Sequence, residues 1–444
     1  MFAFTRNTSR RPGASAALAL ALMCGSALGM VALEAPAAAQ KKKKEDTSGK
    51  PNYSKGFIAA YTAAEALTKS GDNQGAKAQV PTVLAAIETD DDRNAAGGLV
   101  FNLGAALSDQ ALQMQGVEMM IASGKTDPAK LGQFNYIAYQ LASQAGNAES
   151  ARKYLASAID LGHTFEGKLT DGTTRTFGPD DMRGMMAETY FDAENYAGGF
   201  DYLRQQIAQR VAAGQPVPQS WITRGLSVAY TNGQADSAVE FGTLFVRHFP
   251  SDTSWGDAIA IQRNMVDYDA QHTLDLLRLA ARTNALRDTR SYVDYIEAAD
   301  PRRLPGEVKR VVEAGVSSGK LTSGDVFVNE ASTIANARIA ADRADMPALE
   351  RDAMKPGSTA LTATAAGDAF LSYQDWAKAE AMYSIAATKP GADLGRVLTR
   401  LGIAQAEQGK TAEAIETFAK VDGSRKNIAD LWTLYAQQKS APAT

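Results

Sequence analysis

Several short segments carry residue types that serve catalysis in other proteins, and each departs from the pattern that the chemistry needs. Residues 315–319 read Gly-Val-Ser-Ser-Gly, the letters of a nucleophile elbow, but that motif requires a strand before the serine, and residues 308–314 have a helical pattern. Residues 162–168 begin like a phosphate-binding loop, yet Leu169 stands where Ser or Thr must reach magnesium. We therefore predict a helix end at 315–319 and no phosphate-binding loop at 162–168.

Candidate metal ligands are equally incomplete. Residues 90–94 imitate the opening of a calcium loop, but the turn glycine and the closing carboxylate are both replaced. The three histidines, His163, His248 and His272, are far apart, and Cys24 is the single cysteine. Paired carboxylates are plentiful, but acid–base catalysis would require two of them to converge in a cleft. The sequence predicts no catalytic residue, no cofactor and no metal site.

The elements that would position any site are helices at a nearly constant spacing. From about residue 53, apolar residues recur every three or four positions, and glycine-containing pairs separate the helical segments. Gly402 follows Gly367 by 35 residues, and Ala414 follows Ala379 by the same interval. A helical hairpin of this size cannot bury its own apolar face, so neighbouring hairpins must stack. The same interval predicts earlier second helices near Ala344, Val308, Thr273 and Ala238.

This pattern resembles the tetratricopeptide repeat, a helix-turn-helix unit of about 34 residues. Residues 395–422, 360–390 and 219–250 match it best, whereas 255–355 keep the period but lose most of the signature. The resemblance implies an all-α fold, a right-handed α-solenoid of about ten helix-turn-helix units. Residues 427–438 read as a C-terminal capping helix with Ile428, Leu431, Trp432 and Tyr435 on one face.

The packing roles follow from residue size. Ala238, Ala379 and Ala414 are expected where two helices approach most closely, because a larger side chain would force the helices apart. Aromatic side chains are expected to fill the volume between layers, namely Phe245, Tyr383 and Phe418.

An insertion near residues 165–178 interrupts the repeat. Asp171-Gly172 lies between two short β-prone runs, which predicts a tight β-hairpin. The hairpin is interpreted either as a surface decoration or as a flap beside the groove of the solenoid.

The first 39 residues have the pattern of a signal peptide. Arg6, Arg10 and Arg11 precede an apolar stretch at 14–33, and Ala37-Ala38-Ala39 predicts cleavage before Gln40. We therefore expect a periplasmic protein of a Gram-negative bacterium.

The remaining chain is predicted to have four parts. Residues 40–56 form a basic disordered linker that contacts an anionic membrane surface, folds back on its own body or stays solvated. The helical parts are N-terminal repeats at 57–250, degenerate repeats at 251–355, and C-terminal repeats with the capping helix at 356–438.

The chain has 46 basic and 50 acidic residues, a net charge of −4 that argues against nucleic acid as a partner. Membrane contact is expected only through Lys41, Lys42, Lys43 and Lys44.

The architecture predicts function on a concave surface lined by the first helix of each unit. We expect a non-catalytic scaffold that binds protein or peptide partners in the envelope. Two alternatives stay open: a cell-wall-associated enzyme or enzyme accessory, and a carrier of small molecules. The candidate partner-binding residues are Tyr136, Gln140, Glu188, Thr223, Ser227, Tyr230, Asp368 and Arg396.

Overall fold

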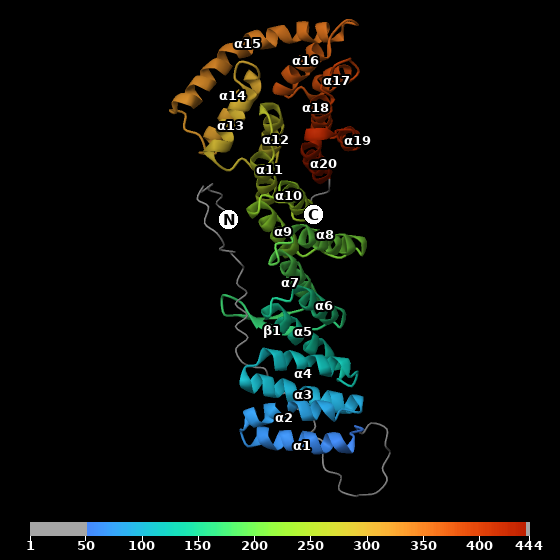
Figure 1. The fold of residues 1–444 in the computed structure, drawn as a ribbon. Coiled ribbons are helices and arrows are strands. Elements are labelled where there is room, and N and C mark those ends of the chain that lie inside the picture. The colour runs from blue at the N-terminus through green and yellow to red at the C-terminus, as the bar shows by residue number, and fades with distance from the viewer. Residues whose placement is uncertain (1–50, 441–444) are drawn as a thin grey trace. The chain divides into compact units, whose positions relative to one another are not determined.

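A computed structural model describes residues 51–440 of the chain. The predicted signal peptide, the lysine run and most of the basic linker lie outside the described residues. Within the described part the structure has twenty α-helices, one short 3-10 helix and one two-stranded sheet (Figure 1). The all-α fold class is confirmed.

The chain divides into two compact units with the boundary between Gln206 and Ile207, inside helix α8. The finer division predicted at residues 250 and 355 stays a prediction. The elements up to and including α8 are α1 (Lys55–Lys69), α2 (Asn73–Ala85), α3 (Asp90–Leu107), α4 (Gln110–Ala122), α5 (Pro128–Gln144), α6 (Ala148–Asp160), β1 (Phe165–Lys168), β2 (Thr174–Phe177), α7 (Pro179–Phe191) and α8 (Tyr196–Ala212).

The second unit, residues 207–444, contains the remaining elements. In chain order they are α9 (Gln219–Thr231), α10 (Ala235–His248), α11 (Asp252–Met265), α12 (Ala270–Arg282), α13 (Thr289–Ala299), α14 (Pro305–Ser317), α15 (Val326–Met354), α16 (Ala360–Ser372), α17 (Trp376–Ala387), α18 (Leu394–Glu407), α19 (Thr411–Phe418), η1 (Gly423–Arg425) and α20 (Lys426–Ser440).

Consecutive helices pack against each other as hairpins, and a glycine–aromatic contact recurs where they cross. A Cβ atom on Gly225 of α9 would lie 2.6 Å from the Phe241 ring of α10, and one on Gly367 of α16 would lie 2.7 Å from Tyr383 of α17. Gly402 of α18 meets Phe418 of α19 in the same way. In all three hairpins only glycine leaves room for a buried aromatic ring against the first helix.

The small residues predicted at close approaches, Ala238, Ala379 and Ala414, are completely buried. The predicted layer-filling aromatics are buried as well, with Phe245, Tyr383 and Phe418 at most 8% exposed. The period of about 35 residues therefore reflects one packing solution used repeatedly.

Helix α15 corrects one prediction. Residues 326–354 form a single helix of 29 residues, whereas the repeat spacing predicted a separate second helix near Ala344. The segment contains no glycine, and helix α15 continues through Pro347, so nothing in the sequence ends a first helix there. Val308, Thr273 and Ala238 do lie in second helices, α14, α12 and α10.

A two-stranded antiparallel hairpin, β1–β2, lies between α6 and α7 at the predicted position. Phe165 pairs with Phe177, and Lys168 pairs with Thr174, so the connection is a loop of residues 169–173 and not a two-residue turn. The Asp171 carboxylate accepts hydrogen bonds from the amide and hydroxyl of Thr173, which stabilise this loop.

The last helix closes the second unit on itself. Helix α20 packs against α18 and α19, as the predicted cap should, and also against α10 and α12. The indole N–H of Trp432 donates to the Asp275 carbonyl at 3.1 Å, and the Gln438 amide donates to the Val246 carbonyl at 3.2 Å. One continuous apolar core joins residues of α10–α12 with residues of α16–α20. The residues expected to cover the last layer thus also contact the beginning of the unit.

Candidate functional site

The structure places the eight predicted partner-binding residues on five helices. Three lie in the first unit: Tyr136 and Gln140 on α5 and Glu188 on α7. The other five lie in the second unit, with Thr223, Ser227 and Tyr230 on α9, Asp368 on α16 and Arg396 on α18.

Two of these assignments need correction, because the side chains are buried. Tyr136 is 5% exposed and stacks on Phe165 of the β-hairpin, with ring centroids 4.5 Å apart. Asp368 is 7% exposed and forms an ion pair with Arg396, another predicted residue. Tyr136 and Asp368 therefore stabilise the fold from inside and present no surface to a partner in this structure.

The other six predicted residues are half-buried. On α9, Thr223, Ser227 and Tyr230 are spaced by four and three residues, which places them on one face of the helix. Their role in partner binding stays a prediction.

The incomplete motifs have structural explanations. Helix α14 ends at Ser317 and Ser318 caps it, so the serines of the 315–319 segment belong to a helix end, as predicted. Asp90 starts α3, and Asp92 forms a capping box with Thr89. Between residues 51 and 440, no group of three or more His, Cys, Asp or Glu side chains could hold a metal ion. In the same range no helix is both long enough and apolar enough to cross a membrane.

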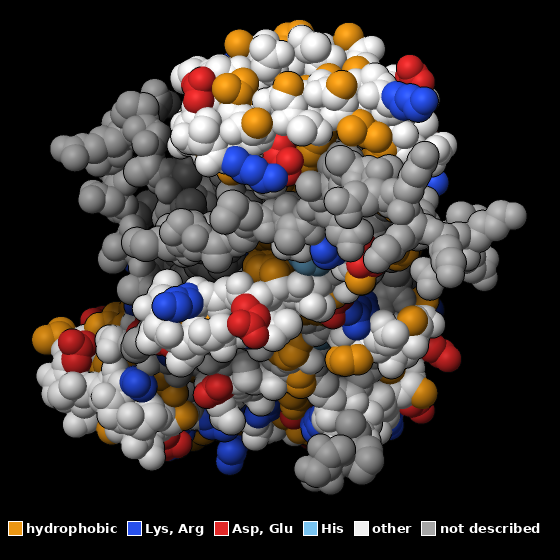
Figure 2. Space-filling model, turned by 90° about the horizontal axis from the view of Figure 1, so that it is seen from below, with side chains coloured by type: hydrophobic (Ala, Val, Ile, Leu, Met, Phe, Trp, Pro, Cys, Tyr) orange, Lys and Arg blue, Asp and Glu red, His pale blue; other side chains and the backbone are white. Residues whose placement is uncertain are grey.

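Charged side chains on the visible surface are interspersed. Figure 2 shows Lys and Arg alternating with Asp and Glu among apolar side chains, with no large area of one sign on the described part of that face.

The most unusual group of side chains is a buried ionic network inside the second unit. Its first part joins α12 to α14. Arg278 donates from Nε and Nη2 to the two carboxylate oxygens of Glu307, both at 2.7 Å, and from Nη1 to Asp275 at 2.8 Å. The Tyr295 hydroxyl donates to Glu307 at 2.8 Å. The parallel pair of bonds fixes both planar groups in one geometry.

The second part brings in α18 and η1. Arg400, fully buried, donates from Nη1 to Asp368 at 2.7 Å and from Nε to Asp275 at 3.1 Å. Arg425 donates to Asp275 at 2.6 Å across 150 residues of sequence. The Tyr383 hydroxyl donates to Asp368 at 2.7 Å. Residues from α12, α14, α16, α18 and η1 thus meet in one network.

The arginines hold these buried carboxyl groups in the charged form. Burial by itself raises the pKa of Asp275, but the attraction of Arg400, Arg425 and Arg278 outweighs it and leaves the pKa well below the usual value. Burial and arginine attraction oppose each other in the same way at Glu307 and Asp368, and the pKa of each is lowered. The three carboxyl groups of the network are therefore charged at neutral pH.

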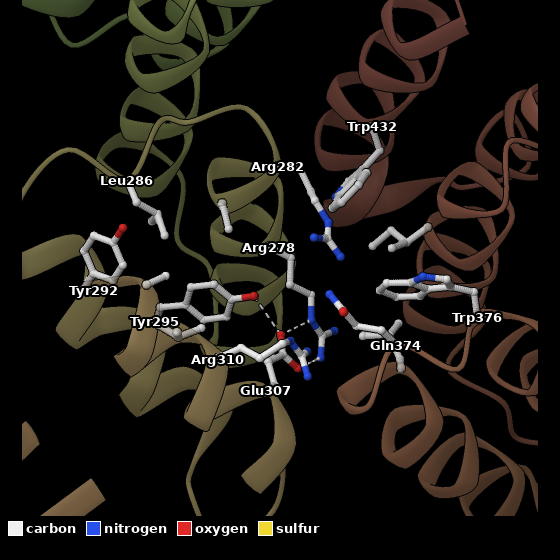
Figure 3. A pocket seen from close by; sticks show the side chains of 15 residues that line it. Arg278, Arg282, Leu286, Tyr292, Tyr295, Glu307, Arg310, Gln374, Trp376 and Trp432 are labelled. Carbon is white, nitrogen blue, oxygen red and sulfur yellow. Dashed lines mark hydrogen bonds and ion pairs between the residues drawn. The ribbon is translucent and has the colours of Figure 1, made fainter. Parts of the chain in front are cut away.

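A cavity of about 210 Å³ opens beside the network (Figure 3). Its deep part contains Arg278, Glu307 and Tyr295, and its rim contains Gln374 and Trp376. The other lining residues are Ala281, Arg282, Leu286, Tyr292, Arg310, Val311, Ala314, Leu371, Ile403 and Trp432.

The positive charges of two other lining arginines, Arg310 and Arg282, are less completely neutralised by carboxylates than the charge of Arg278. Arg310 donates from Nη1 to the backbone carbonyls of Gly306 and Ser372 at 2.9 and 2.7 Å, and within residues 51–440 no carboxylate lies within ion-pair distance of it. Burial is the main cause that lowers the pKa of Arg310. Arg282 contacts Glu407 through Nε at 3.3 Å and lies over the Trp376 ring at 5.3 Å.

Sequence reasoning did not find this site. Except for Asp275 and Arg278, which are three residues apart on α12, the ionic pairs are separated by 28 to 150 residues, and no local spacing signals them. Asp368 and Arg396 were both predicted on first helices, but as residues of a concave partner-binding surface and not of a buried network.

Neither a family model nor a curated protein matches the chain. Solved structures with some likeness are Naa15/Naa10 bound to HypK-THB (11% identity, 86% of this chain and 68% of that chain, TM-score 0.35), the TPR2AB-domain:pHSP90 complex of yeast Sti1 (12%, 70% and 95%, 0.23) and the APC/C hetero-tetramer Cut9–Hcn1 (11%, 86% and 70%, 0.21). At these TM-scores the likenesses carry no argument about the site.

Proposed function

We propose that this protein is an exported, non-catalytic helical-repeat scaffold that binds protein or peptide partners. The support comes from the repeated hairpins, and in particular from α9, which buries one side and leaves the other half-buried. Such stacks offer extended surfaces for partners. The observation that carries the proposal is the polar stripe on α9, where Thr223, Ser227 and Tyr230 share one half-buried face.

Thr223→Arg tests this stripe, and Thr243→Arg on α10 is a matched control. Both threonines are half-buried, and both donate their hydroxyl to the carbonyl four residues earlier, at 3.1 and 2.9 Å. After mild crosslinking in envelope extract, we expect the Thr223 variant to lose partners that the wild type and the control retain. Equal retention or equal loss in the two variants would count against the stripe.

Export is the second part of the proposal. The basic start, the apolar stretch and the small residues before Gln40 support a cleaved signal peptide. Amino-terminal sequencing of the protein from a periplasmic fraction should begin at Gln40. Recovery of a chain that still begins at Met1 would contradict cleavage. Incubation with purified cell wall should release no fragments, whereas released glycan or peptide would favour the enzyme alternative.

A further inference from the structure

We propose that the cavity of the second unit binds a small organic carboxylate, with Arg310 and Arg282 contacting the carboxylate and Trp376 contacting the apolar part. This inference goes beyond partner binding on helix surfaces, because it concerns a different site with a different class of ligand.

Charge imbalance around the cavity is the first argument. The cavity is lined by three arginines, Arg278, Arg282 and Arg310, and by one carboxylate, Glu307. Arg278 pairs with Glu307 and Arg282 pairs with Glu407, so the positive charge of Arg310 is in excess. A buried cation without its own anion is unfavourable, so an anion entering the cavity would be stabilised.

The uncompensated positive charge lies on Arg310, in the wall of the cavity. Its two hydrogen bonds go to backbone carbonyls, whose partial charges do not neutralise a guanidinium. Its side chain is one of the walls of the cavity. A carboxylate in the cavity would supply the missing countercharge and accept the planar N–H groups of a guanidinium.

Two helices and one loop aim polar groups into the same space. Figure 3 shows Arg282 from α12, Arg310 from α14 and the Gln374 side chain from the loop between α16 and α17 turned toward the cavity. Since Arg282 uses Nε for Glu407, its Nη groups are left for a ligand. The arrangement can hold one carboxylate with several charge-assisted hydrogen bonds.

The size and the walls of the cavity limit the ligand. A volume of about 210 Å³ corresponds to roughly seven water molecules. Tyr292, Tyr295, Trp376 and Ile403 provide aromatic and apolar contact area. A single ring carrying one carboxylate fits these limits, whereas a long peptide does not.

Gln374, at the rim of the cavity, has an unusual backbone conformation. It has a φ of +62°, in the left-handed region that favours glycine. The corresponding loop position, immediately before the N-cap of the second helix, is glycine in four other hairpins: Gly71, Gly146, Gly233 and Gly409. Two further hairpins have a non-glycine residue with positive φ at this position, Ser108 and Glu194, so the backbone conformation alone marks no function. Gln374 differs because its side chain is directed into the cavity.

The first experiment compares carboxylates with their amides. Isothermal titration of the full chain would use benzoate, phenylacetate and indole-3-acetate, each beside its uncharged amide. At least one carboxylate should bind at least tenfold more tightly than its amide, and Arg310→Gln should weaken that binding at least tenfold. No preference for any carboxylate, or unchanged binding by the Arg310 variant, would overturn the proposal. A tetrapeptide with a free carboxyl terminus that binds more tightly than every small acid would also overturn it.

The second experiment does not depend on the Arg310 variant folding. Gln374→Gly relieves the backbone strain, and Glu194→Gly does the same at φ +55° in the loop between α7 and α8 of the first unit. Both variants should melt at a higher temperature than the wild type, but only Gln374→Gly should weaken carboxylate binding, by threefold or more. Unchanged binding by a stabilised Gln374 variant would remove Gln374 from the site. Partner capture by α9 is measured separately, so either proposal can fail alone.

Discussion

At the residue scale, the free energy of burying a charged side chain depends on whether its oppositely charged partner is present. Arg278 and Glu307 are 4% and 3% exposed, and each offers the other a bidentate contact. Removing water from both groups is unfavourable, and the pair recovers that free energy only while both members are present. Loss of one member leaves the other buried and charged.

Glu307→Gln should therefore lower the free energy of unfolding of the second unit by about 3–5 kcal/mol. Glu313→Gln on the same helix is the control, because Glu313 forms an exposed i,i+4 pair with Lys309 and its loss should change the free energy of unfolding by less than about 1 kcal/mol. Urea unfolding followed by circular dichroism measures both. Similar midpoints for the two variants would show that the buried pair adds nothing beyond an exposed one.

The same carboxyl groups make stability depend on pH. The folded-state pKa of Asp275, Glu307 and Asp368 lies below the unfolded values of 3.8 for Asp and 4.5 for Glu. A lowered pKa contributes stability that is complete above the unfolded pKa and is lost as pH falls toward the folded pKa. The urea midpoint should thus hold between pH 7 and 5 and fall below about pH 4. Glu307→Gln should show a smaller acid-induced fall, and a curve parallel to the wild type would contradict this assignment.

The sequence revealed part of the residue-scale picture. Asp368 and Arg396 were predicted to line a concave surface and bind a partner protein, whereas in the structure they form an ion pair with each other, with Asp368 buried. Asp368 forms ion pairs with Arg396 and Arg400. The position of Arg400 relative to Asp368 depends on how α16 and α18 pack. A single sequence contains no record of such a contact.

At the element scale, the glycine–aromatic crossings explain why the repeat could be read from the sequence. Each hairpin solves its packing locally, over 16 residues from Gly225 to Phe241 or from Gly402 to Phe418. Helix α15 was mispredicted because the period was extended across a segment with no helix-ending residue. The hairpin β1–β2 was found from turn and strand residues, but its packing on Tyr136 depends on α5 and was not visible.

Gly225→Ala should destabilise the second unit by about 1–3 kcal/mol, because the added methyl group would overlap the buried Phe241 ring. Gly56→Ala is the matched control, since Gly56 is exposed in α1 and a Cβ atom there would meet no neighbour within 4 Å. Alanine has the higher helix propensity, so the control should be neutral or stabilising by up to about 1 kcal/mol. The melting temperature of each variant is compared with that of the wild type. An unchanged melting temperature of the Gly225 variant would contradict the close approach of Gly225 to Phe241.

At the scale of the whole molecule, the second unit differs from an open array of repeats. In an open array each repeat contacts only its neighbours, and distant repeats unfold separately. Here α20 contacts α10 and α12, so the two ends of the unit share one core. The sequence predicted the capping helix and its apolar face, but the repeat pattern did not predict that this helix also contacts α10 and α12.

Trp432→Ala should therefore affect both ends of the second unit. The indole is completely buried and bonded to the Asp275 carbonyl, and its removal should lower the free energy of unfolding by about 3–5 kcal/mol. Hydrogen exchange should accelerate in α10 and α12 as well as in α18 and α20. Trp221→Ala, at a buried position of α9, should accelerate exchange near α9 and α10 and leave α20 protected. Acceleration confined to α18–α20 in the Trp432 variant would mean that the ends are not coupled.

The return of α20 also fixes the order in which the second unit can be completed during synthesis. Asp275 precedes Trp432 by 157 residues. At about 5–20 residues per second, a ribosome needs about 8–30 s to make that stretch. For most of this interval the nascent chain carries Asp275 without Arg400 and Arg425, which follow it by 125 and 150 residues. The apolar surface of α12 lacks α20 until the end of the interval. A stop codon that removed only the last few turns of α20 would thus expose residues that were synthesised up to about 30 s earlier. We expect such a truncation to destabilise the second unit as much as a mutation in the middle of its core.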